Sequence, residues 1–186
     1  MKINKLLIAN RGEIALRIIR SLKKMNIQSV AVYADNDLNS AHVAMADQAF
    51  SLGGGALKDT YLNAEKLIKI AQHCGADAIH PGYGFLSENA GFSQACADAG
   101  IVFVGPDPGS IRLMGNKVAA RETAKTFGLP VTAGLTGSTE TLLANAARLN
   151  FPVLVKAAAG GGGKGMRIVQ SADTLQQVIE TTSREA

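Results

Sequence analysis

The stretch Phe151-Pro-Val-Leu-Val-Lys156-Ala-Ala-Ala-Gly160-Gly-Gly-Gly-Lys164-Gly165-Met-Arg167-Ile-Val169 decides how the second half of this chain folds. It begins with an apolar run that predicts a buried strand, passes through a glycine-dense loop, and ends in a second short apolar strand. Glycine has no Cβ and adopts positive φ freely, so such a loop can turn its amides toward an anion. Lys156 and Lys164 add positive charge beside the loop. Taken alone, the stretch fits a phosphate-covering loop and a flexible hairpin tip equally well.

The composition limits the kinds of protein to which this loop can belong. A chain of 186 residues with 47% hydrophobic and 18% charged residues indicates a globular protein with a substantial core. The net charge of +4 is spread along the sequence, and aromatic residues make up 5% with no Trp, so no nucleic-acid partner is expected. No apolar run is long enough for a signal peptide or a membrane span, so no membrane partner is expected either. We expect a cytoplasmic protein, or a mitochondrial-matrix protein if a transit peptide has been removed.

The two cysteines and three histidines predict no metal or redox site. Cys74 and Cys96 lie far apart in neither a metal-binding nor a redox spacing, which suits a reducing compartment. Cys96 shares the apolar side of a helix with Phe92, so we interpret it as a small core residue. The histidines have no cluster of Asp, Glu or Cys near them.

Strands alternate with helices through the first part of the chain, which predicts an α/β fold with a doubly wound parallel sheet. The predicted strands are Lys5–Ala9, Ser29–Tyr33, Ala49–Phe50, Asp77–His80 and Ile101–Val104. The predicted helices are Glu13–Met25, a short one through His42 and Met45, Asn63–Cys74, and one capped by Ser87 that runs to Ala99.

The alternation of strands and helices ends at Pro106-Asp-Pro108, which is interpreted as the end of the sheet unit. The segments after it are predicted to be helices and a hairpin. Asn116 is expected to cap a connecting helix from Lys117 to Phe127. Later elements are a helix from Thr139 to Leu149, the two strands around the glycine loop, and a helix capped by Ser171. The predicted domains are residues 1–114, a connecting helix at 115–130, and an incomplete domain at 131–186, because two strands are too few for an independent sheet.

Two loops leave strands at the carboxyl edge of the predicted sheet, where open α/β sheets bind ligands. The loop Asn10-Arg-Gly-Glu13 lacks the G-x-G-x-x-G of a dinucleotide fingerprint. The loop His80-Pro-Gly-Tyr-Gly84 is either a ligand loop with an unusual backbone path or a structural tight turn. The glycine loop is not a Walker A motif, because Gly165 follows Lys164 and the loop joins two strands.

Four segments together resemble the biotin carboxylase component of biotin-dependent carboxylases. They are Ala9-Asn-Arg-Gly-Glu-Ile-Ala15, His80-Pro-Gly-Tyr-Gly-Phe-Leu-Ser-Glu-Asn89, Ile111-Arg-Leu-Met-Gly-Asn-Lys117 and Gly160-Gly-Gly-Gly-Lys-Gly-Met-Arg167. The resemblance covers nearly the whole chain, in order and with the family's spacing. It implies a Rossmann-like domain followed by the start of an ATP-grasp domain with a glycine-rich lid.

The resemblance also implies roles for particular residues. Lys117 and Lys156 are expected to hold ATP phosphates, and Gly161, Gly162, Gly163 and Lys164 to close over them. Tyr83 and Gly84 are expected in the pocket for biotin and bicarbonate. Arg17 and Arg20 match positions at the family's homodimer interface, although with Lys24 they equally fit an exposed basic helix face.

The implied reaction activates bicarbonate with MgATP and carboxylates biotin by way of carboxyphosphate. The family's Mg²⁺ ligands, adenine hinge and catalytic residues come later in its sequence, so none is expected here. We therefore interpret the chain as an N-terminal fragment, inactive alone, of an acyl-CoA or pyruvate carboxylase. The implied partners are a biotin carboxyl carrier domain and a carboxyltransferase component. The alternatives are another ATP-grasp ligase, such as carbamoyl-phosphate synthetase, and a non-catalytic assembly module.

Overall fold

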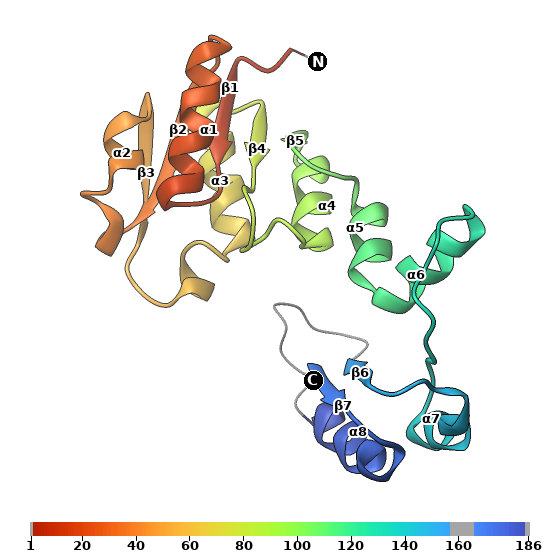
Figure 1. Cartoon of the computed structure of the whole chain (residues 1–186). Coiled ribbons are helices and arrows are strands. Elements are labelled where there is room, and N and C mark those ends of the chain that lie inside the picture. The colour runs from red at the N-terminus through yellow and green to blue at the C-terminus, as the bar shows by residue number, and fades with distance from the viewer. Residues whose placement is uncertain (1, 157–165, 185–186) are drawn as a thin grey trace. The chain divides into compact units, whose positions relative to one another are not determined.

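A computed structural model describes residues 2–156 and 166–184 of the chain. The chain divides into two compact units, residues 1–112 and 113–186 (Figure 1). No helix within the described residues is long and apolar enough to cross a membrane.

The first unit is the predicted α/β sheet, and its five strands all pair in parallel in the order β3-β2-β1-β4-β5 (Figure 1). Its elements are β1 (Lys5–Ile8), α1 (Gly12–Lys24), β2 (Gln28–Ala34), the 3-10 turn η1 (Asp35–Asp37), α2 (Ala41–Met45), β3 (Gln48–Gly53), the 3-10 turn η2 (Leu57–Asp59), α3 (Ala64–Cys74), β4 (Ala78–His80), α4 (Ala90–Asp98), β5 (Val102–Phe103) and α5 (Pro108–Gly115). The division between the units falls inside α5.

The sheet is buried on both faces because successive side chains of its strands point to opposite sides. Leu7 of β1 belongs to the cluster formed with α3 and α4, which includes Phe92 and Cys96. Leu6 and Ile8 belong to the cluster formed with α1. Cys96 is fully buried, as the sequence predicts. The central strand is therefore held from both sides, which fixes the position of the loop that follows it.

Three local predictions for this unit are wrong. Asn89, not Ser87, caps α4, because its side chain accepts the Phe92 N–H at 2.9 Å. The last strand has two residues rather than four. Asp107 and Pro108 start a helix, α5, where the sequence analysis placed only a break. Asp107 Oδ1 accepts N–H groups from the first turn at 2.8 and 3.0 Å, and proline is favoured as the first helical residue.

The second unit contains three helices and an antiparallel hairpin within its described residues. Its elements are α6 (Lys117–Thr126), α7 (Thr139–Ala144), the 3-10 turn η3 (Ala146–Arg148), β6 (Val153–Lys156), β7 (Met166–Val169), the 3-10 turn η4 (Ala172–Thr174) and α8 (Leu175–Arg184). A small core of Val169, Leu175 and Ile179 joins the hairpin to α8.

Asn116 caps α6 as predicted, accepting the Val118 and Ala119 N–H groups at 3.1 and 3.0 Å. Two other predictions for this unit are wrong. The helix that starts at Thr139 ends at Ala144 and continues only as the turn η3. Ser171 makes no side-chain cap, and the turn η4 precedes α8 instead.

Candidate functional site

The carboxyl edge of the parallel sheet brings together the loops that follow β1 and β4. These strands are neighbours in the sheet, and their pairing extends one residue further through the bond from Ala9 N–H to His80 O at 2.9 Å. Asn10 and Arg11 then leave β1, while Pro81 and the residues after it leave β4. This is the edge at which open α/β sheets bind ligands.

Asn10 holds these two loops together. Its side chain is buried, and its Nδ2 donates to Pro81 O at 2.7 Å and to Tyr83 O at 2.9 Å. Its Oδ1 accepts the Arg11 N–H at 2.9 Å. The chain passes close over this amide at Gly82, where φ is +68° and a Cβ would lie 2.7 Å from Asn10 Nδ2. Only glycine fits this close approach without movement of Asn10.

Tyr83 and Gly84 are presented to solvent at the tip of this loop. Tyr83 is 60% exposed, and its phenol donates a hydrogen bond to Glu13 Oε1 in the first turn of α1. Accepting that proton, Glu13 raises the pKa of the Tyr83 phenol. Gly84 has φ of +64°, and a Cβ placed on it would meet nothing within 4 Å. The two residues predicted for the ligand pocket are thus accessible at the ligand-binding edge.

Arg11 extends the site toward β2. Its guanidinium pairs with Asp37 Oδ2 at 3.1 Å and lies 5.3 Å from the ring centroid of Tyr61 and 5.8 Å from that of Phe85. The stacked rings of Tyr61 and Phe85 are 5.4 Å apart. Both distances from the guanidinium suit cation–π contacts. Arg11 therefore connects the β1 loop to Phe85, which directly follows Gly84.

Asp37 is the acceptor at the centre of this cluster. The Tyr61 hydroxyl donates to its Oδ2 at 2.6 Å and accepts the Ala34 N–H at 3.0 Å. Partial burial pushes the pKa of Asp37 upward, but the bonds from Tyr61 and Arg11 outweigh it and hold the pKa below its ordinary value. Burial, together with this bond to Asp37, raises the pKa of Tyr61. Asp37 therefore stays ionised and Tyr61 stays protonated.

The nearby histidines serve the fold. His80 Nδ1 accepts the Gly82 N–H at 2.9 Å, and burial lowers the pKa of His80. His42 is buried beneath β2, with Nε2 3.3 Å from Val32 O, and burial lowers its pKa as well. No group of three His, Cys, Asp or Glu side chains that could hold a metal occurs among the residues that the structure describes.

The second unit carries the two lysines predicted for phosphate. Lys156 is the last residue of β6, is exposed, and pairs across the hairpin with Met166. The neighbouring cross-strand pair on the same face is Leu154 with Ile168, 48% and 66% exposed. Lys117 is exposed at the start of α6. Gly161, Gly162, Gly163 and Lys164 lie outside the described residues.

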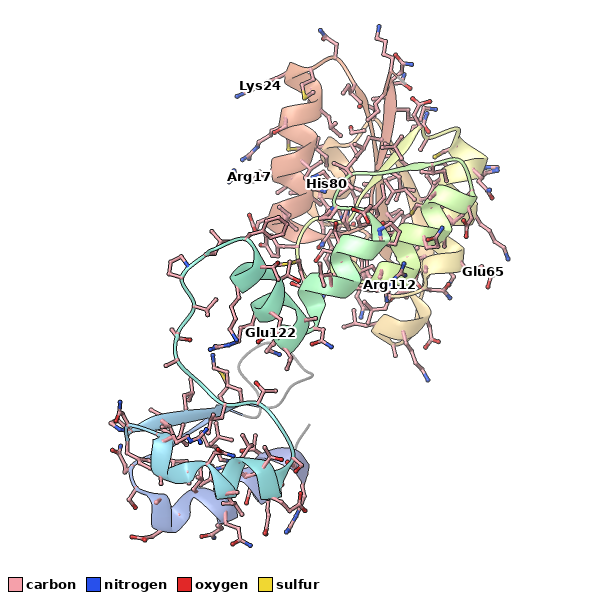
Figure 2. The ribbon with its side chains drawn as sticks, turned by 90° about the vertical axis from the view of Figure 1, so that its right-hand side faces the viewer. Arg17, Lys24, Glu65, His80, Arg112 and Glu122 are labelled. Atoms are coloured by element: carbon pink, nitrogen blue, oxygen red, sulfur yellow. The ribbon has the colours of Figure 1, made fainter. Side chains whose placement is uncertain are left out.

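Arg17 and Arg20 are exposed on α1, and Arg17 and Lys24 project outward from that helix (Figure 2). Arg17 also borders an apolar groove of about 370 Å³, whose lining includes Ile14, Ile18 and Val104. A basic side chain beside an open apolar groove suits a protein contact surface.

Roles for Asn10 and Glu13 were not predicted from the sequence, although both residues lie in the motif Ala9-Asn-Arg-Gly-Glu-Ile-Ala15. The position of Asn10 could have indicated its role, because it directly follows a central strand at the edge where open α/β sheets bind ligands. Glu13 carried no such signal, because its partner lies 70 residues away. The cluster of Arg11, Asp37 and Tyr61 was missed for the same reason.

Comparisons with known proteins match this architecture. Residues 2–111 match the family model described as biotin carboxylase, N-terminal domain. The chain belongs to this biotin carboxylase family. Residues 116–186 match a second model, described as the ATP-binding domain of the carbamoyl-phosphate synthase L chain.

Biotin carboxylases and their relatives align with essentially the whole chain. The mitochondrial methylcrotonoyl-CoA carboxylase subunit alpha of Mus musculus is 50% identical over 99% of this chain and 26% of its own length. Biotin carboxylase 1 of Bacillus subtilis is 48% identical over 99% of this chain and 42% of its own length. The chain thus spans less than half the length of either relative.

A solved structure of the family has the same fold. The biotin carboxylase domain of the Hydrogenobacter thermophilus 2-oxoglutarate carboxylase, a dimer with MgADP, ADP and bicarbonate, has a TM-score of 0.92 and 44% identity. The match covers 100% of this chain and 42% of that one. The family resemblance predicted from the four motifs is therefore confirmed, as is the α/β fold with a parallel sheet.

Proposed function

We propose that this chain supplies the N-terminal domain and the start of the ATP lid of a biotin carboxylase. In this proposal the complete enzyme uses ATP and bicarbonate to carboxylate biotin, and serves an acyl-CoA or pyruvate carboxylase. The match of residues 2–111 to the biotin carboxylase family supports this reading over carbamoyl-phosphate synthetase, whose model matches only residues 116–186.

The main support for ATP binding by this chain is the exposed face of the β6–β7 hairpin. Lys156 and the apolar side chains Leu154, Met166 and Ile168 share this face, by the register of the two strands. A nucleotide needs this combination, an apolar surface for its base and a cation for its phosphates. We assign phosphate binding to Lys156 and Lys117, and closure over the phosphates to Gly161, Gly162, Gly163 and Lys164.

Tyr83 and Gly84 are assigned to the pocket for biotin and bicarbonate. Their position at the carboxyl edge of the sheet supports this assignment, as does the exposure of Tyr83. The described residues offer no cluster of metal ligands. Mg²⁺ is proposed to bind with ATP at ligands that come later in the family's sequence, where it neutralises phosphate charge, and we expect no turnover from these residues alone.

The remaining proposals concern assembly. Arg17, which borders the apolar groove along α1, and Arg20 on the same helix are proposed to lie at a homodimer interface. A biotin carboxyl carrier domain and a carboxyltransferase component are the proposed partners, and the cytoplasm or mitochondrial matrix is the proposed compartment. Residues 1–114, 115–130 and 131–186 are proposed as the sheet domain, the connection and the lid portion.

Kinetics of a chimera test the nucleotide assignment. This chain replaces the matching part of Bacillus subtilis biotin carboxylase 1, and Lys156→Ala is compared with Lys125→Ala. Lys125 is a control in the same unit that pairs with Glu122. Because one hydrogen bond to a charged group contributes about 1.5–3 kcal/mol, Lys156→Ala should raise the KM for ATP about 10- to 150-fold.

The KM for bicarbonate should change little in Lys156→Ala, and Lys125→Ala should resemble the parent chimera. Equal increases in the KM values for ATP and bicarbonate would argue against a phosphate role for Lys156.

A further inference from the structure

The loop that presents Tyr83 has no regular secondary structure of its own, yet its path is fixed by contacts from the β1–α1 junction. Two side chains of that junction, Asn10 and Glu13, form hydrogen bonds to it. Asn10 binds its main chain and Glu13 binds the Tyr83 phenol. Neither residue is among those assigned to ligand binding above.

Asn10 is suited to hold the main chain because nearly all of its hydrogen-bonding capacity is committed. Its two donated bonds, at 2.7 and 2.9 Å, end on carbonyls two residues apart, those of Pro81 and Tyr83. The residue between them is Gly82, whose missing Cβ lets the loop wrap around the amide. An aspartate at position 10 would turn an acceptor toward two carbonyl oxygens, which repel it.

Glu13 is suited to hold the side chain because it stands in the first turn of α1, where a carboxylate is favoured by the helix dipole. Tyr83 is 60% exposed, and this hydrogen bond restricts the orientation of its ring. The phenol donates its proton to Glu13 Oε1. The phenol oxygen is left with acceptor capacity only, next to a negative charge.

We propose that Asn10 and Glu13 are positioning residues for the Tyr83–Gly84 loop, and that they present the Tyr83 oxygen as an acceptor for a ligand N–H. A cyclic urea such as the ureide of biotin carries such N–H donors. Bicarbonate is an anion, and the adjacent Glu13 carboxylate repels it from this position. The ligand assignment rests on the function proposed above, whereas the positioning by Asn10 and Glu13 does not.

The Tyr83 phenol is itself the reporter that tests the positioning. The full chain is labelled with ¹³Cζ-tyrosine, and the Tyr83 resonance is assigned with Tyr83→Phe among the three tyrosines. In the wild-type chain its pKa should lie above the ordinary tyrosine value, because Glu13 accepts its proton. Glu13→Gln should return it toward that ordinary value.

Glu88→Gln, which removes an exposed carboxylate of the same loop, is the control and should leave the Tyr83 pKa unchanged. A merely structural role for Glu13 would not change this pKa. An unchanged pKa in Glu13→Gln overturns the role of Glu13.

The unmutated chain tests Asn10 directly, without a substitution. Scalar couplings across hydrogen bonds should connect Asn10 Nδ2 with the carbonyl carbons of Pro81 and Tyr83. Their absence overturns the role of Asn10.

Titration with 2-imidazolidone, a cyclic urea, and with bicarbonate then tests the ligand preference on the same resonance. The urea should shift the Tyr83 signal in the wild-type chain and bicarbonate should not. A response to bicarbonate alone, or to neither ligand, overturns the acceptor proposal, while the pKa and the couplings still decide the positioning.

Discussion

Gly82→Ala should destabilise the first unit more than Gly84→Ala, although both glycines lie in one loop and have nearly the same φ, +68° and +64°. An alanine in this left-handed region costs roughly 1–2 kcal/mol at either position. At Gly84 that is the whole cost, because the new Cβ meets nothing within 4 Å. At Gly82 the new Cβ would lie 2.7, 3.1 and 3.2 Å from the Nδ2, Cγ and Cβ atoms of Asn10.

The added cost at Gly82 is the displacement of Asn10. Moving its amide weakens the two hydrogen bonds to Pro81 O and Tyr83 O. Each bond contributes about 0.5–1.5 kcal/mol, so Gly82→Ala should cost about 1–3 kcal/mol more than Gly84→Ala.

Urea unfolding followed by tyrosine fluorescence measures this difference in the full chain. All three tyrosines, at positions 33, 61 and 83, lie in the first unit, and the chain has no Trp. With an m-value of about 1–3 kcal/mol/M, the midpoints of the two variants should differ by roughly 1 M. Equal midpoints would refute the reasoning, because they would mean that the loop does not close upon Asn10.

Three further results are expected from the full chain. Arg17→Glu should weaken self-association at least tenfold by light scattering, whereas Lys69→Glu on α3 should not; an equally associated Arg17→Glu chain would remove the proposed interface. Burial lowers the pKa of His42, so the unfolded chain binds more protons below about pH 6.5 and stability falls as the pH drops. His42→Gln should reduce the slope of unfolding free energy against pH by up to about 1.4 kcal/mol per pH unit and leave the part of the slope that is due to His80. An unchanged slope would exclude His42 as its source. Burial raises the pKa of Cys96 to about 11, so iodoacetamide should alkylate the half-buried Cys74 first and Cys96 only on unfolding; early labelling of Cys96 would contradict its burial.

The strands and helices of the first unit could be predicted because their apolar residues recur with clear periods. Ile18, Ile19 and Leu22 mark the buried side of α1 in the sequence, and all three are buried in the structure. Helix boundaries were predicted well where the capping residue directly precedes the helix, as at Asn63 and Asn116. The misplaced cap at Ser87 came from choosing a residue two positions too early.

The start of α5 was missed because Pro108 was interpreted as a break. Proline ends a helix when it occurs inside one, but it favours the first helical position, and Asp107 before it supplies the cap. Pro108 is therefore compatible with either the end or the start of a helix, and the capping Asp107 before it indicates a start.

The site was only partly predictable for a different reason. Tyr83 and Gly84 stand in a recognisable motif, and the sheet edge fixes where their loop must lie. Their partners Asn10 and Glu13 are 73 and 70 residues away from Tyr83 in sequence. Such contacts follow from the pairing of β1 with β4, which no local pattern contains.

The central claim is that the exposed face of the β6–β7 hairpin binds ATP, and methyl NMR of Met166 tests it most directly. The full chain is labelled at its methionine methyl groups, with Met166 assigned by Met166→Leu, and titrated with MgATP. The Met166 methyl should shift as ATP is added, and this response should be lost in Lys156→Ala but kept in Lys125→Ala. The claim that this face binds the nucleotide would be contradicted if the Met166 methyl resonance did not shift with millimolar ATP, or if it shifted equally in Lys156→Ala.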